Sequence, residues 1–205
     1  ICEEIPDTNI DDIAKAIGLD PRIGNLFLNA GPGYGGSCLP KDVKAIIKLS
    51  SKIGVKPTLL NAVEKTNEQQ INNIIELIKR NIGKINGKKL TILGIAFKPG
   101  TDDIRDSVGI ELISRLLKSG AKITIHDPKA LENARKIFRD DIKYAKSVPD
   151  ALKDCQCAII MTEWKEYKKI NNKTIKHMAK KVIIDSRRIL YNKNLDAKYF
   201  AIGLG

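Results

Sequence analysis

The sequence predicts an α/β protein in which a helical region, residues 1–83, precedes a doubly wound parallel sheet over residues 84–205. Two observations support this prediction. Up to about residue 82 the apolar residues recur mainly at helical spacing, whereas from Lys88 short continuous apolar runs alternate with amphipathic segments. Strands that are apolar throughout are typical of a parallel sheet covered by helices on both faces. The second region is therefore expected to be Rossmann-like.

Three helices are expected in the first region. Asn9 caps a helix that has acidic residues in its first turn and ends at Gly18. A second helix covers Pro40 to Gly54, and a third follows Pro57 and continues to about Gly83. A polar stretch, Asn67 to Gln70, interrupts the apolar pattern of the third helix. A helix of this length is typical of a segment that bridges two domains or two subunits.

The second region contains four clear strand patterns and a weaker one at its end. The clear patterns are the apolar runs in KLTILGIAF, AKITIHD, CAIIMT and KVIID. Between the first two lies an amphipathic helix, SVGIELISRLLKSG, which Gly120 ends. Shorter helical patterns occur at residues 149–153 and 174–180, and KYFAIGLG is expected to add an edge strand.

The net charge of +12 at pH 7 raises the question of nucleic-acid binding. The lysines are scattered along the chain instead of forming a basic stripe, and aromatic residues make up only 5% of it. We therefore favour a solvated lysine surface, whose field also attracts phosphorylated small molecules. No run of about eighteen apolar residues is present, so no membrane span is expected.

The four cysteines are few and irregularly spaced, which suits a reducing cytoplasm better than a disulfide framework. Cys155 and Cys157 lack a second cysteine pair, and the two histidines lie far apart in sequence, so no metal site is expected. The chain begins with Ile1 and Cys2 and not with an initiator Met. We therefore expect it to be part of a longer protein.

Basic residues follow two of the predicted strands. Lys98 and Arg105 come after the first strand, and Arg187 comes after the strand that ends near Asp185. Ligands of open parallel sheets bind beyond the carboxyl ends of the strands. We expect Lys98 and Arg187 to lie at the ends of neighbouring strands, where their charges would hold a diphosphate.

The turn after the first strand, GIAFKPGTDD, lacks the G-x-G-x-x-G spacing of a dinucleotide site. This predicts a nucleotide without nicotinamide at this sheet. Asp127 follows the second strand, where an acidic residue binds ribose in dinucleotide sites. The pair Asp127-Pro128 is equally typical of a turn, and both interpretations remain open.

Cys38 follows a glycine-rich loop and precedes Pro40, a residue suited to the first turn of a helix. The positive end of that helix and the neighbouring Lys41 favour a thiolate, and Asp42 is placed to orient a water. The glycines of the loop allow close approach to a bulky ligand. Two interpretations remain: a nucleophile, which the whole motif favours, or a buried cysteine in a tight turn.

The string GPGYGGSCLPKD closely resembles the catalytic-cysteine motif of the nucleotide-sugar 6-dehydrogenase family. Further segments resemble landmarks of that family in the same order: DPRIGNLFLNAG, LGIAFKPGTDDIRDS, HDP, TEW and IDSRRIL. The similarity spans nearly the whole chain. It implies a helical central domain that forms a homodimer through its long helix, followed by a Rossmann-like domain that binds a UDP-sugar.

The resemblance also implies a reaction, the four-electron oxidation of a nucleotide-sugar 6-hydroxyl to a carboxylate with NAD as the cofactor. Cys38 would attack the aldehyde, the thiohemiacetal would become a thioester, and Asp42 would assist its hydrolysis. Arg105 would reach the NAD pyrophosphate, and Arg22 would contact substrate across the dimer. The other implied substrate contacts are Gly33, Tyr34, Gly35, Lys98 and Arg187.

The sequence departs from the family pattern because it contains neither the N-terminal NAD-binding domain nor the upstream helical segment that supplies a catalytic lysine and asparagine. Ser37 and the pair Lys41 and Asp42 favour the UDP-glucose branch, whose product is UDP-glucuronate. UDP-N-acetylmannosamine and GDP-mannose are the alternative substrates. A further alternative is a fragment that binds a UDP-sugar without oxidising it.

Overall fold

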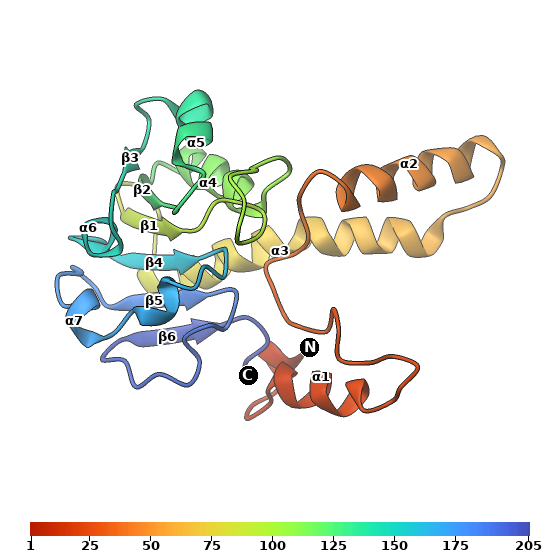
Figure 1. Ribbon diagram of the computed structural model, residues 1–205, viewed down its shortest axis with the longest axis horizontal. Coiled ribbons are helices and arrows are strands. Elements are labelled where there is room, and N and C mark those ends of the chain that lie inside the picture. The colour runs from red at the N-terminus through yellow and green to blue at the C-terminus, as the bar shows by residue number, and fades with distance from the viewer.

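The computed structural model describes residues 1–205 and confirms the predicted α/β fold (Figure 1). A short 3-10 helix, η1 (Cys2–Glu4), and the helices α1 (Ile10–Gly18), α2 (Leu39–Lys52) and α3 (Thr58–Ile82) precede the sheet. The Asn9 side chain caps α1 by accepting a hydrogen bond from the N–H of Asp11 at 3.0 Å, as the sequence predicts. Helix α2 folds back along the first half of α3, and this pair projects away from the sheet (Figure 1).

Helix α3 connects the projecting pair to the sheet. Its buried residues are Ile71, Ile74, Ile78 and Ile82, spaced by three or four positions so that they share one face. All of them lie in the second half of the helix and belong to the core that surrounds the sheet. The first half of α3 buries no residue in this way. One end of α3 is therefore fixed by packing, while the other end carries α2.

The sheet has six parallel strands in the order β3-β2-β1-β4-β5-β6. The predicted doubly wound arrangement is confirmed. The strands are β1 (Lys89–Leu93), β2 (Lys122–His126), β3 (Lys143–Tyr144), β4 (Cys157–Ile160), β5 (Val182–Asp185) and β6 (Lys198–Ala201). The helices between them are α4 (Val108–Lys118), α5 (Leu131–Phe138), α6 (Val148–Leu152), η2 (Tyr167–Lys169) and α7 (Asn172–Ile175).

The strand order corrects one expectation. Lys98 follows β1 and Arg187 follows β5, but β4 lies between these strands, so the two basic residues do not follow neighbouring strands. The chain builds outward from β1 to β2 and β3, then returns to the other side of β1 with β4. The order therefore reverses between β1 and β4, and the crevice at such a switch point is where ligands of these sheets bind.

The sequence did not predict α5 or the two-residue strand β3, nor the short 3-10 helices η1 and η2. The segment of α5 carries a short apolar pattern, with Ala134 and Phe138 buried four residues apart. A strand of two residues has no detectable periodicity. It forms here because it pairs in parallel with Thr124 and Ile125 of β2.

The hydrophobic core contains 38 residues, all of which come from Ile71 onward. The central strands β4 and β5 are buried at every position, as expected of strands covered on both faces. Although α3 has 25 residues, neither it nor any other helix combines the length and apolar character needed to cross a bilayer.

Candidate functional site

Cys38 stands immediately before α2, which confirms its predicted place at the start of a helix. Pro40 is the second residue of the helix, and the N–H of Asp42 donates to the carbonyl of Cys38 at 2.9 Å. The thiol is exposed, with the Ser37 hydroxyl oxygen 3.7 Å from its sulfur. The interpretation of Cys38 as a buried cysteine in a tight turn is therefore wrong.

Two cationic side chains, Lys41 and Arg105, lie close enough to Cys38 to interact with its charge. The pKa of Lys41 is raised, first by its hydrogen bond to Asp42 and last by the Cys38 thiolate. The pKa of Arg105 is raised, first by its hydrogen bond to Asp103 and last by the same thiolate. Lys41 and Arg105 come from different parts of the chain. The tertiary fold therefore adds a second cation to the one that the sequence places beside the thiol.

The other cysteines are buried, and two of them are held in the thiol form. Burial raises the pKa of Cys155 to about 11 and raises that of Cys157 as well. Because the thiolate is the reactive species, these two side chains are poor nucleophiles. Cys38 is the one exposed thiol of the chain.

The glycine loop before Cys38 lies against the segment that follows β1. The N–H of Gly36 donates to the carbonyl of Asp106 at 3.4 Å. Gly36 has a φ of +89°, and a Cβ at this position would lie 2.5 Å from the Phe97 ring. A Cβ at Gly35 would lie 2.2 Å from the carbonyl oxygen of Asp106. Side chains at either position would push the loop away from the sheet, and this explains the two adjacent glycines.

Arg187 lies on the sheet side of the same loop. Its Nε donates to the Met161 carbonyl at 3.0 Å and is 3.1 Å from a Glu163 carboxylate oxygen. The Asp185 carboxylate accepts a hydrogen bond from the Arg187 N–H at 3.1 Å and so fixes the turn after β5. Burial lowers the pKa of Arg187, and Glu163 opposes this effect. A Cβ at Gly31 would lie 3.0 Å from the guanidinium, so the loop and Arg187 are in close contact.

Four expected substrate contacts therefore gather at one place. Gly33, Gly35 and Arg187 line a small cavity of about 10 Å³ together with Phe97, and Tyr34 lies in the same loop. The cavity lies beyond the carboxyl ends of β1 and β5, beside the switch point.

Three other expected contacts point outward instead. The Arg22 side chain is 87% exposed and pairs with Asp20 at 2.6 Å. Arg105 is also exposed and pairs with Asp103 at 2.6 Å. Lys98 is exposed, with its Nζ 5.4 Å from the centre of the Phe97 ring. These side chains are available to a ligand or a partner. None of them pairs with a residue of the loop, although Arg105 lies near enough to Cys38 for a weak electrostatic interaction.

The Asp127 carboxylate is buried and bonded within the protein. This favours its interpretation as a turn residue over that as a ribose-binding residue. Its two oxygens accept five hydrogen bonds at 2.8–3.1 Å, from the N–H groups of Ile95, Ala96, Lys129 and Ala130 and from the Trp164 indole. The N–H groups after β1 are those that a dinucleotide pyrophosphate would need. The C-terminal sheet does not fit NAD, because a carboxylate of the protein already occupies these donors.

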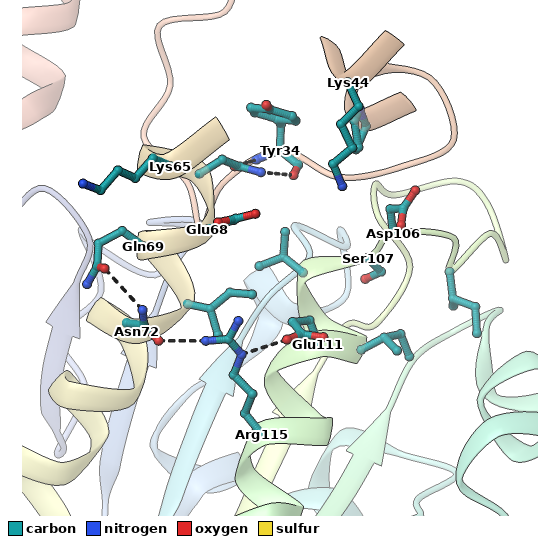
Figure 2. A pocket seen from close by; sticks show the side chains of 16 residues that line it. Tyr34, Lys44, Lys65, Glu68, Gln69, Asn72, Asp106, Ser107, Glu111 and Arg115 are labelled. Carbon is teal, nitrogen blue, oxygen red and sulfur yellow. Dashed lines mark hydrogen bonds and ion pairs between the residues drawn. The ribbon is translucent and has the colours of Figure 1, made fainter. Parts of the chain in front are cut away.

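A larger cavity of about 560 Å³ opens between α3 and α4, and Tyr34 is one of the residues that line it (Figure 2). Arg115 of α4 crosses its floor, where the guanidinium donates to the Asn72 carboxamide at 2.7 Å and pairs with Glu111 at 2.8 Å. Lys44 and Lys65 extend from α2 and α3 near its rim. The sequence analysis did not predict this cavity, because α3 and α4 come together only through tertiary packing.

Comparison with known proteins identifies the family. Residues 1–69 match the central domain, and residues 91–192 the UDP-binding domain, of the UDP-glucose/GDP-mannose dehydrogenase family. The chain belongs to this family. The matched segments include the glycine loop with Cys38 and the turns that carry Lys98 and Arg187, so the assembled site lies within the regions that define the family.

Individual members of the UDP-glucose/GDP-mannose dehydrogenase family resemble the chain closely. It is 40% identical to the UDP-glucose 6-dehydrogenase of Rickettsia felis over 99% of its own length and 46% of the relative. It is 43% identical to that of Haloferax volcanii over 87% of its length and 41% of the relative. A UDP-glucose dehydrogenase structure from Pyrobaculum islandicum superposes with a TM-score of 0.88 at 32% identity, covering 96% of this chain and 44% of the other. The chain thus spans a little less than half of these relatives.

Two residues beside the loop escaped the sequence analysis, Asn67 and Glu64 of α3, which both bind Tyr34. A signal for the first was present. Asn67 begins the polar stretch that interrupts the apolar pattern of the long helix. Nothing in the sequence indicated which segment, 33 residues away, this polar stretch would meet.

Proposed function

We propose that this chain is the part of a UDP-glucose 6-dehydrogenase that carries the cysteine nucleophile and holds the nucleotide sugar. The complete reaction is then the oxidation of UDP-glucose to UDP-glucuronate. One observation carries this proposal. The exposed Cys38 ends a glycine loop that packs on Phe97 and Arg187 at the switch point of the sheet. The relatives named UDP-glucose 6-dehydrogenase, at about 40% identity, support this substrate.

The residues of the site suggest how the chemistry would proceed. A first two-electron oxidation converts the 6-hydroxyl to an aldehyde. The Cys38 thiolate attacks C6 of this aldehyde and forms a thiohemiacetal, with the Lys41 and Arg105 cations nearby. Oxidation of this adduct leaves a thioester on Cys38. Asp42 assists a water that hydrolyses the thioester and releases the sugar acid.

We assign the substrate contacts to the loop and to the turns of the sheet. Gly33, Tyr34 and Gly35 line the sugar, and Arg187 binds the diphosphate from a partly buried position. Lys98 is free to approach the same diphosphate because its ammonium group lies in solvent. NAD, when bound, accepts the hydrides of the oxidation. Arg105 is the one residue of this chain that we assign to contact with NAD.

A homodimer is also proposed, with the pair of helices α2 and α3 at its interface. Leu49 of α2 is 58% exposed, Ile53, which follows the end of α2, is 66% exposed, and Leu59 of α3 is 76% exposed. Apolar side chains gathered in this way on a projecting element are typical of an interaction surface. In such a dimer the exposed Arg22 would reach the substrate of the other subunit. The molar mass in solution, measured by light scattering, tests this assignment, and a monomer at all concentrations would contradict it.

Titration calorimetry with the 205-residue protein tests the substrate assignment. UDP-glucose is expected to bind, and Arg187→Ala should weaken the binding by about 10-fold to 100-fold, because a charge-assisted contact contributes about 1.5–3 kcal/mol. Arg80→Ala, at an exposed site near the end of α3, is the matched control and should bind as the unsubstituted protein does. UDP-N-acetylmannosamine and GDP-mannose, titrated in parallel, should bind more weakly. Stronger binding of either would overturn the choice of UDP-glucose.

The same preparation is expected to form no NADH from UDP-glucose and NAD+, even at high protein concentration. The reason is that Asp127 occupies the N–H groups that a dinucleotide would need at this sheet. The absorbance of reduced nicotinamide measures the product. NADH production by these 205 residues would place NAD on the C-terminal sheet and contradict this interpretation.

A further inference from the structure

Tyr34, four residues before Cys38, is held by α3 through its backbone. The N–H of Tyr34 donates to the Asn67 carboxamide oxygen at 2.8 Å, and the Asn67 carboxamide N–H donates to the carbonyl of Tyr34 at 3.0 Å. One side chain thus satisfies both backbone polar groups of one loop residue. Gly33 makes this possible, since its φ is +107° and a Cβ there would lie 2.6 Å from the Asn67 oxygen.

The side chain of Tyr34 is held by the same face of α3. Its hydroxyl donates to the carboxylate of Glu64, which precedes Asn67 by three residues and so lies on the same face of the helix. The Glu64 side chain is only 15% exposed, and its second oxygen is 3.9 Å from the ammonium of Lys44. Burial, followed by the nearby Glu64, raises the pKa of Tyr34 to about 12. The phenol therefore remains a donor throughout the neutral range.

The opposite side of the loop is fixed by the sheet. Gly36 donates to the carbonyl of Asp106 and contacts the Phe97 ring, as described above. On the α3 side, Ile71 follows Asn67 by one turn and is buried in the core of the sheet. The loop is thus clamped between two segments that are both anchored in the same core, with Cys38 at its end.

We propose that Asn67 and Glu64 are positioning residues of the active site. By holding Tyr34 they set the loop at the distance from Phe97 and Arg187 at which Cys38 meets the sugar. This inference rests on the proposed function and adds two residues to it. Neither Asn67 nor Glu64 needs to touch the substrate for this role.

If Asn67 and Glu64 only stabilised the fold, their replacement would lower the free energy of unfolding. A positioning role predicts a different result. The first half of α3 buries no apolar residue, so the contacts with Tyr34 lie outside the core. Loss of the clamp should therefore leave global unfolding almost unchanged but loosen the loop. The sugar part of UDP-glucose binding depends on the loop, whereas the UDP part depends on Arg187 and Lys98. The two parts of the affinity should respond differently.

The decisive variant is Asn67→Ala, with Asn73→Ala as its control, an exposed amide on the same helix that does not contact the loop. In Asn67→Ala the dissociation constant of UDP should change by less than about 2-fold. UDP-glucose should lose about 10-fold in affinity, and its protection of Cys38 against iodoacetamide should fall by a similar factor. Asn73→Ala should match the unsubstituted protein in all three measurements. Equal UDP-glucose affinity and equal protection in the two variants would overturn the proposal.

Glu64 provides a test by conservative replacement. Glu64→Gln retains an oxygen that accepts from the Tyr34 hydroxyl, whereas Glu64→Ala does not. Protection of Cys38 should be retained in Glu64→Gln and reduced about 10-fold in Glu64→Ala. Equal loss in both would contradict a role through Tyr34. Tyr34→Phe removes only the hydroxyl and should reduce protection as Glu64→Ala does, so these variants test the proposal if Asn67→Ala fails to fold.

Hydrogen exchange separates the failure of this inference from failure of the proposed function. The amides of residues 33–38 in the ligand-free protein should exchange at least about 10-fold faster in Asn67→Ala than in Asn73→Ala. This result does not depend on any ligand. If UDP-glucose does not bind the unsubstituted protein, the proposed function is wrong, while unchanged exchange would show that the clamp itself does not hold the loop.

Discussion

The two regions of the chain place their apolar side chains in opposite ways. Fifteen of the sixteen exposed large hydrophobic side chains precede residue 64, and the remaining one is Ile137. All 38 residues of the core follow residue 70. The sheet region is thus stable through its own packing, while the helical region presents its apolar surface outward. Cys38, the exposed thiol that we propose as the nucleophile, lies in the region without a core.

In the proposed function this difference divides two tasks, which are holding the nucleotide sugar and carrying the thiol. The sheet supplies a rigid platform, in which Arg187 and Asp127 are fixed by several hydrogen bonds each. The helical region supplies the loop that carries the exposed Cys38 thiol. Helix α3 links the two, because its second half is buried with the sheet and its first half binds Tyr34. Precision at Cys38 therefore depends on α3.

The largest expected effect concerns the nucleophile. In any preparation containing this chain that oxidises UDP-glucose, Cys38→Ser should lower the rate of sugar-acid release by about 10³-fold or more. A serine hydroxyl is a weaker nucleophile at neutral pH, and an ester is hydrolysed more slowly than a thioester. Mass spectrometry should detect a stalled covalent ester. The control is Cys2→Ser, which should retain activity. A Cys38→Ser variant with most of the original turnover would remove the nucleophile assignment.

The next effect tests the contrast in packing. Ile92→Ala removes a fully buried side chain from β1 and should lower the free energy of unfolding by about 2–5 kcal/mol. Leu49→Ala on α2 should change it by less than about 0.5 kcal/mol when measured on the monomer, because this side chain is 58% exposed. Urea denaturation followed by circular dichroism measures both. Similar losses in the two variants would show that the helical region has a core of its own.

Thiol reactivity gives a third comparison between the regions. At pH 8 and limiting iodoacetamide, Cys38 should be alkylated at least about 100-fold faster than Cys155 in the folded protein. Cys155 is buried and its pKa is about 11, so only about 0.1% of it is ionised at that pH. Peptide mapping by mass spectrometry identifies the labelled residue. Denatured protein is the control, and there the two rates should converge. Faster labelling of Cys155 in the folded state would contradict the expected order.

The smallest effect is a pH dependence that arises in the sheet region. Burial lowers the pKa of His126 below its ordinary value of 6.5, although the nearby Glu166 and Asp127 oppose this shift. The unfolded chain therefore binds more protons than the folded chain just below pH 6.5, and stability should fall as the pH decreases through this window. One such group contributes at most about 1.4 kcal/mol per pH unit.

Urea denaturation between pH 5 and pH 8 measures this contribution, in a range of about three pH units around the ordinary histidine pKa. His126→Gln should flatten the decline below pH 6.5, whereas the exposed His177→Gln should leave it unchanged. A decline of the same slope in His126→Gln would assign the pH dependence to other groups.

The sequence by itself determined the local structure around Cys38. Glycines followed by Cys38 and Pro40 predict a loop that enters a helix, and the structure confirms it. The apolar runs predicted four of the strands, since a strand buried on both faces requires apolar side chains at every position. These features depend on neighbouring residues, and for this reason they can be found without knowledge of the fold.

The tertiary structure alone decided which distant residues meet. The return of the chain to the far side of β1 placed β4 between the strands that precede Lys98 and Arg187, and no local pattern specifies strand order. Asp127 lies 31 and 32 residues from the N–H groups that it binds after β1. Asn67 and Tyr34 are 33 residues apart. Hydrogen-bond partners of polar side chains are fixed by packing between elements, so the residues that position the site became visible only in the folded chain.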